Sequence, residues 1–294
     1  MRIGFALPQF GGPAHQVDQV AGFARWVEEL GADSLWVGDR LLAPVHPSVG
    51  YGGGSAPIPA TFRAGLDPFV LLTVAAAATS RVLLGTNVLN APWYPPALLG
   101  RALTSIDLLS GGRLLLGFGV GWSPEEYLAA GVPMGERGAR LDECLDALEA
   151  WWTTDPVSFS GKHWSVPATY VQLKSPQVPR PPIYLAGGAP VALERVARRG
   201  DGWLPVCRDS FSPAVLEPLS RIRLMAEGFG RDPQSIRVVL RVNSSGDATV
   251  SGIADVLARA ESAGVEHAFV DLQYLAGSVD SVKLFAEGIL STVR

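Results

Sequence analysis

The feature that most constrains the fold is an alternation of short apolar runs with segments of helical periodicity along the whole chain. Such alternation is typical of successive strand–helix units, which pair as a parallel sheet covered by helices. Eight runs fit the count of a closed barrel, and barrels of this size are common as single domains. The predicted strands are Ile3–Leu7, Ser34–Gly38, Val82–Thr86, Leu114–Phe118, Ile183–Ala186, Gly202–Pro205, Ile236–Leu240 and His267–Asp271. We therefore expect an α/β chain that forms one (β/α)8 TIM barrel over residues 1–294.

Helix starts are marked by a capping residue followed by proline. Asp67-Pro68, Ser123-Pro124 and Ser212-Pro213 each place a side-chain oxygen before a residue that lacks the N–H group. This arrangement satisfies backbone donors that a first helical turn leaves unpaired. These signals predict where three of the helices begin.

Two segments interrupt the alternation. Residues 40–66, after the second strand, are rich in glycine and proline and predict a long irregular loop. Loops after barrel strands build the active site, so this segment is a candidate lid, although a disordered decoration fits the composition equally well. Residues 152–182, before the fifth strand, contain a predicted small hairpin near Val157–Trp164.

Composition excludes several kinds of partner. The formal net charge is −4, which gives no general attraction to nucleic acid or to an anionic membrane. The N-terminus begins as a strand and lacks signal-peptide features, so we expect a cytoplasmic protein with a small-molecule substrate. Cys144 and Cys207 form no C-x-x-C pair, and the four histidines are too dispersed to predict a metal site. A homodimer is expected only as the commonest closed assembly.

Polar and glycine-rich residues follow several predicted strands, at the end where barrels bind ligands. Glycine allows backbone N–H groups to approach a ligand, and a following helix N-terminus favours a phosphate. Together these turns predict a phosphorylated cofactor across the mouth of the barrel. They are Asp39-Arg40, Thr86-Asn87, Gly117–Trp122 and Ala186–Ala189.

Four segments carry a family resemblance. The runs Leu83–Leu89, Leu109–Trp122, Gly187-Gly188 and Gly200–Pro205 are similar to those of the luciferase-like monooxygenase family. The chain most resembles the actinobacterial branch that uses the deazaflavin coenzyme F420 in place of FMN. The resemblance implies an oxidoreductase.

The resemblance also implies site residues. Asp39 matches a carboxylate that contacts the deazaflavin ring, and Asn87-Val88 matches a bulge with a non-prolyl cis peptide behind the ring. Asp39 and the neighbouring Arg40 are the candidate catalytic residues. The predicted phosphate and ribityl contacts are Gly119, Val120, Gly121, Gly187, Gly188 and Ala189.

The sequence departs from the deazaflavin-dependent sugar-phosphate dehydrogenases. Their histidine after the aspartate and glutamate after the glycine run are replaced by Arg40 and Trp122, neither of which is a ready general base. Aromatic residues favour a flat or apolar substrate. Trp203 fits the barrel core equally well, and a solvated surface position is the simpler interpretation of Arg208. The candidate substrate residues are His46, Tyr51, Trp93, Trp122, Trp203 and Arg208.

Three functions are compatible with these features. The first is hydride transfer between coenzyme F420 and an unidentified small organic molecule. The second is an FMN-dependent two-component monooxygenase that is supplied by a separate flavin reductase. The third is a deazaflavin-binding carrier or regulator without turnover, since a fold alone does not establish catalysis.

Overall fold

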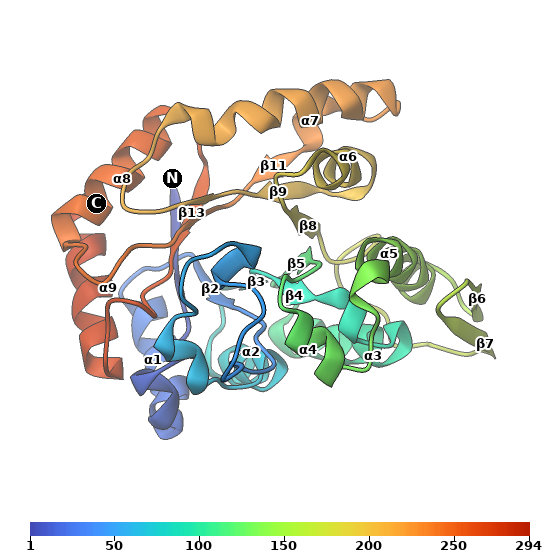
Figure 1. Ribbon diagram of the computed structural model, residues 1–294, viewed down its shortest axis with the longest axis horizontal. Coiled ribbons are helices and arrows are strands. Elements are labelled where there is room, and N and C mark those ends of the chain that lie inside the picture. Colours follow the sequence, from blue (N-terminus) through green and yellow to red (C-terminus); the bar gives the residue numbers. More distant parts are fainter.

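The computed structural model describes residues 1–294 and shows a parallel barrel surrounded by helices (Figure 1). Parallel pairing runs from β1 through β2, β3, β5, β8 and β9, and β13 pairs with the opposite side of β1. This confirms the predicted (β/α)8 fold. The strands are β1 (Arg2–Ala6), β2 (Ser34–Val37), β3 (Leu83–Thr86), β4 (Leu89–Asn90), β5 (Leu114–Gly119), β8 (Ile183–Ala186), β9 (Gly202–Leu204), β10 (Val206–Cys207), β11 (Arg237–Val238), β12 (Leu240–Val242) and β13 (His267–Val270).

The barrel closes through two interrupted strands. β9 and β10 form the sixth strand, and β11 and β12 form the seventh. β9 pairs with β11, and β10 pairs with β12. The backbone bond from Arg241 N to Pro205 O, at 3.0 Å, continues the pairing across the break. The predicted Ile236–Leu240 strand begins within one residue of the observed one but ends too early, because the observed strand continues to Val242. The sixth strand likewise extends beyond Pro205 to Cys207.

Large and small side chains alternate inside the barrel. Trp36 stacks on Phe269 with ring centroids 4.6 Å apart, and glycines on the neighbouring strands leave room for the rings. A Cβ atom on Gly85 would lie 2.3 Å from the Trp36 ring, and one on Gly202 would lie 2.3 Å from Tyr184. The barrel interior is thus a packed core below its carboxyl mouth, as expected for this architecture.

Nine helices cover the barrel and bury its outer face. The predicted caps are present: the side chains of Asp67 and Ser123 accept from Val70 N and Glu126 N. Ser212 also caps, but the element that it starts is a 3-10 turn at Pro213–Leu216, and the α-helix begins only at Glu217. The outward-facing strand residues share one apolar core with every helix except the short α4. The helices are α1 (Val20–Glu29), α2 (Pro68–Ala78), α3 (Pro96–Ser110), α4 (Pro124–Ala129), α5 (Arg137–Thr153), α6 (Pro190–Arg199), α7 (Glu217–Gly228), α8 (Val250–Ser262) and α9 (Val279–Val293).

Both insertions lie outside the regular alternation. The segment before β8 contains the antiparallel hairpin β6 (Val157–Ser160) and β7 (Ser165–Thr169), which projects at the right edge of Figure 1. The 40–66 loop runs near α4, and Ser48 N donates to Glu125 Oε1 at 2.7 Å. No helix is both long and apolar enough to cross a bilayer.

Candidate active site

A cavity of about 350 Å³ opens at the carboxyl end of the barrel strands. It receives residues from the ends of β1, β2, β3, β5, β8, β12 and β13 and from the 40–66 loop. Ten of the predicted site residues line it: Asp39, Arg40, Tyr51, Asn87, Val88, Gly119, Val120, Gly121, Trp122 and Gly187. The strand ends that the sequence marked as polar or glycine-rich therefore do converge.

A bulge between β3 and β4 forms one wall of the cavity. The Asn87-Val88 peptide is cis, as the family resemblance implied. Below the bulge, Thr86 Oγ1 donates to Gly117 O at 2.7 Å and accepts from Gly117 N at 2.8 Å, so a side chain continues the pairing with β5. Val88 packs so closely on β5 that a Cβ on Gly119 would lie 2.5 Å from Val88 Cγ2.

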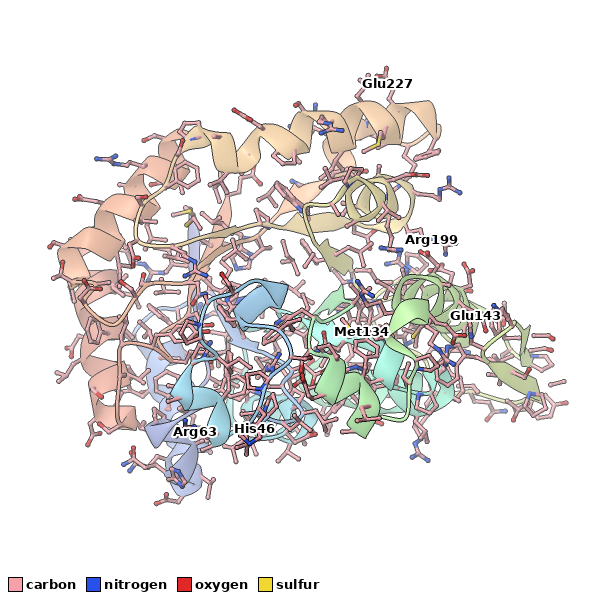
Figure 2. All side chains as sticks on the ribbon, in the orientation of Figure 1. His46, Arg63, Met134, Glu143, Arg199 and Glu227 are labelled. Atoms are coloured by element: carbon pink, nitrogen blue, oxygen red, sulfur yellow. The ribbon has the colours of Figure 1, made fainter.

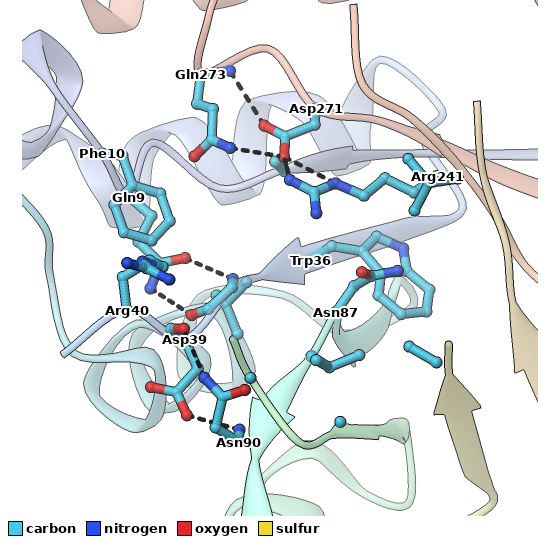
Figure 3. A pocket seen from close by; sticks show the side chains of 18 of the residues that line it. Gln9, Phe10, Trp36, Asp39, Arg40, Asn87, Asn90, Arg241, Asp271 and Gln273 are labelled. Carbon is cyan, nitrogen blue, oxygen red and sulfur yellow. Dashed lines mark hydrogen bonds and ion pairs between the residues drawn. The ribbon is translucent and has the colours of Figure 1, made fainter. Parts of the chain in front are cut away.

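Asp39 lies buried immediately after β2. Its Oδ2 accepts from Asn90 N at 2.9 Å, and Asn90 Nδ2 donates to the Asp39 carbonyl at 3.0 Å (Figure 3). The same Oδ2 accepts from Tyr94 Oη at 3.0 Å. Burial raises the pKa of Asp39 to about 7, although both donors to its carboxylate oppose the rise. This carboxyl group thus changes charge near neutral pH.

Arg40 is held by a buried acid and two aromatic rings. Its Nη1 lies 2.9 Å from Glu126 Oε2, and the guanidinium stacks over Trp122 at 4.3 Å and Phe62 at 5.1 Å. Glu126 Oε1 also accepts from the backbone N–H groups of Leu41 and Leu42. The Arg40 charge is thereby neutralised within the protein, and the start of the 40–66 loop is tied to α4.

The turn after β8 leads to an open helix N-terminus. Gly187 has a φ of 122°, and α6 follows with Ala189 at the N-cap and no capping side chain. Trp203 Nε1 donates to Gly187 O at 3.1 Å and supports the turn from below. An uncapped helix N-terminus of this kind favours a phosphate.

Six predicted site residues do not line the cavity. Gly188 and Ala189 are exposed at the start of α6, and His46 is exposed on the 40–66 loop (Figure 2). Trp93 packs on Tyr127 beneath Gly121. Trp203 faces the helices because its neighbour Leu204 faces the barrel interior, and side chains alternate along a strand.

The sixth, Arg208, is exposed next to the cavity. Its guanidinium lies 5.9 Å from the centre of the Tyr51 ring. The predicted surface position of this arginine is therefore the one observed.

Sequence reasoning missed a polar cluster across the mouth from the bulge. Arg241 and Gln273 both contact Asp271, at the ends of the seventh and eighth strands (Figure 3). The signal was present in the sequence, because polar residues at the ends of other predicted strands had indicated the site. Arg241 directly follows the predicted end of the seventh strand and Asp271 ends the predicted eighth, so both occupy the kind of position where site residues were expected. Gln9 was also missed; it bonds to both backbone groups of Gly38 and fixes β1 against β2.

A closed parallel barrel with a polar, glycine-walled cavity at its carboxyl mouth has the architecture of a barrel enzyme, whose active site lies at this end. The luciferase-like monooxygenase family model matches residues 1–277. The chain belongs to the luciferase-like monooxygenase family, which confirms the predicted class of oxidoreductase.

Relatives support this assignment, and a solved structure shares the fold. An uncharacterised protein of Mycobacterium tuberculosis is 31% identical over 252 residues, covering 83% of this chain and 84% of its own length. An F420-dependent glucose-6-phosphate dehydrogenase of Kribbella flavida is 31% identical over 255 residues, covering 84% and 70%. The monooxygenase RslO1 of Streptomyces bottropensis superposes with a TM-score of 0.75 at 22% identity and covers 99% of both chains.

Proposed function

We propose that this enzyme transfers a hydride between coenzyme F420 and a small organic substrate. The observation that carries the proposal is the wall formed by the Asn87-Val88 bulge between two glycine turns, in a chain that is 31% identical to an F420-dependent dehydrogenase. When bound, the deazaflavin supplies a carbon that donates or accepts a hydride. The protein supplies binding, orientation and a dry cavity.

The residues present fit such a cofactor. Asn87 Nδ2 is buried at the cavity wall without a hydrogen-bond partner, so it can donate to a ring carbonyl. The Val88 side of the bulge and Gly119 form a wall without bulky side chains, suited to a flat ring. The turn Gly187–Ala189 leads from β8, the strand next to β5, into the open N-terminus of α6. This N-terminus would hold a phosphate of the cofactor.

Asp39 and Arg40 have different expected roles. Asp39 would contact the edge of the ring and could exchange a proton with it, because its carboxyl group titrates near neutral pH. Arg40 already has Glu126 as its ion-pair partner and would position the Trp122 ring over the cavity. Neither Arg40 nor Trp122 replaces the base of a sugar-phosphate dehydrogenase, so we do not propose oxidation of a sugar phosphate.

Titration of the purified protein with F420 and with FMN, each followed by fluorescence, tests the cofactor. We expect saturable binding of F420 and much weaker binding of FMN. Tight binding of FMN alone would refute the proposal and favour the two-component monooxygenase. Bleaching of bound oxidised F420 by candidate alcohols, or its recovery with candidate acceptors, then distinguishes an enzyme from a carrier.

A further inference from the structure

The polar cluster formed by Arg241, Asp271 and Gln273 faces the cofactor wall from across the cavity. In the closed order of eight strands, β12 is four positions from β3, and β13 is four positions from β5. A substrate that contacts a ring on the bulge therefore has this cluster on its other side. Between them, the cavity is lined by apolar side chains, among them Phe10, Phe62 and Phe269.

The Arg241 charge is already paired. Its Nε lies 3.1 Å from Asp271 Oδ2, and Nη2 contacts the same oxygen. Gln273 Nε2 donates to that oxygen at 3.0 Å, and Gln273 N donates to Oδ1 at 3.2 Å. Burial opposes the charge of Arg241, but the Asp271 carboxylate outweighs it and holds the pKa of Arg241 above its ordinary value.

Each cationic group in the cavity has its own acidic partner. The charged residues that line the cavity are Asp39, Arg40, Arg241 and Asp271, and Arg40 is paired with Glu126 behind the wall. An anionic substrate would meet no unpaired cation among the residues that line the cavity, and it would lie beside Asp271; Arg208 is exposed outside this lining, next to Tyr51. Desolvation of an unpaired phosphate or carboxylate in such a cavity is costly.

Two polar groups of the cluster remain available to a ligand. Arg241 Nη1 takes no part in the bonds to Asp271, and Figure 3 shows the remaining guanidinium nitrogen directed toward the middle of the cavity. Gln273 uses its Nε2 on Asp271 and keeps Oε1 as an acceptor. A donor and an acceptor side by side are suited to a carbonyl or hydroxyl group.

We propose that Arg241, Asp271 and Gln273 form the substrate subsite for an uncharged oxygen, so that the enzyme acts on neutral carbonyl or hydroxyl compounds and rejects phosphorylated and carboxylated ones. This proposal rests on the proposed function, because the cofactor wall defines which side of the cavity the substrate occupies. Asp271 is the residue that determines the specificity, since its carboxylate cancels the arginine that would otherwise attract an anion.

Benzamide and benzoate provide a matched pair of probes, because they share a flat shape and differ in charge at pH 7.5. Their dissociation constants are measured by thermal shift and calorimetry on the F420-loaded protein. We expect wild-type protein to bind benzamide at least about tenfold more tightly than benzoate. In Asp271→Asn, Arg241 loses its carboxylate partner, and we expect the preference to reverse.

The double variant Arg241→Gln/Asp271→Asn is the control for a folding defect, because it replaces the ion pair with a neutral one. Its two affinities should agree within about threefold. Three results would overturn the proposed subsite. They are equal or tighter binding of benzoate by wild-type protein, no binding of either probe, and an unchanged preference in Asp271→Asn. The probe preference can also be measured on the cofactor-free protein. Failure to bind F420 would therefore refute the proposed function separately from the subsite.

Discussion

Asp39 is a buried carboxyl group whose hydrogen bonds come from the bulge region, through Asn90 and Tyr94. Its pKa is raised to about 7 in the folded chain, mainly by burial. The folded state therefore keeps a proton that the unfolded chain releases near pH 4. Between these values the folded state binds more protons, so this group lowers the stability as the pH rises.

We predict that Asp39→Asn removes this pH dependence. The difference in unfolding free energy, wild type minus variant, should fall by up to about 1.4 kcal/mol per pH unit between pH 4 and pH 7 and then level off. Urea unfolding at several pH values measures it. Asp18→Asn, at an exposed position, is the control and should leave the slope unchanged. A difference that stays flat across this range would show that Asp39 titrates normally.

The same side chain is expected to contact the cofactor. We predict that Asp39→Ala raises the dissociation constant of F420 by about tenfold, equivalent to the loss of one hydrogen bond to a charged group. Fluorescence titration measures the change. An affinity equal to that of the wild type would rule out the proposed contact.

At the scale of elements, the beginning of the 40–66 loop depends on one residue of α4. The Glu126 side chain has no exposure, neutralises Arg40 and accepts from Leu41 and Leu42. The sequence signal at Ser123-Pro124 predicted only where this helix begins. The cap bond from Glu126 N to Ser123 Oγ exists, at 3.5 Å, but the Glu126 carboxylate points instead to the loop.

We predict that Glu126→Ala destabilises the protein by about 3–5 kcal/mol, because it leaves Arg40 buried without its partner. Denaturant unfolding measures the loss. The matched control is Glu194→Ala, which breaks the exposed pair with Arg198 on α6 and should cost less than about 1 kcal/mol. Equal losses in the two variants would contradict this account of the loop.

The contact between β3 and β5 gives a second prediction at this scale. A Cβ on Gly117 would lie 1.8 Å from the Thr86 carbonyl oxygen, so Gly117→Ala must separate the two strands below the bulge. We expect a loss of at least about 1–3 kcal/mol together with weaker F420 binding. Gly22→Ala, in α1 with no atom near the new methyl group, should instead stabilise the protein by about 0.5–1 kcal/mol.

The whole molecule brings the two halves of the site together by closing the barrel. The bulge on β3 and the cluster on β12 and β13 face each other only because the broken sixth and seventh strands complete the ring. A ligand held between opposite strands binds the folded state and has no site in the unfolded chain. Ligand binding is therefore linked to global stability.

We predict that F420 at 100 times its dissociation constant stabilises the protein by about 2.7 kcal/mol. Thermal or denaturant unfolding with and without the cofactor measures the gain. FMN at the same concentration is the control and should produce a much smaller change. A larger gain with FMN would favour the monooxygenase alternative.

The sequence by itself determined the barrel, the helix caps and much of one side of the cavity. Periodicity, capping residues and glycine turns are local signals, and they are readable because each depends on a few neighbouring residues. Asp39, the Asn87-Val88 bulge and Gly187 were found in this way and by the family resemblance. All three line the cavity.

Only the tertiary structure decided which side chains share the cavity and which ones cancel each other's charge. The direction of Trp203 depends on strand register, and the cluster around Arg241 depends on the pairing of β12 with β13. The pairing of Arg40 with Glu126 joins residues that are 86 positions apart, and that of Arg241 with Asp271 joins neighbouring strands. Such contacts arise from the closure of the sheet, which no local pattern records.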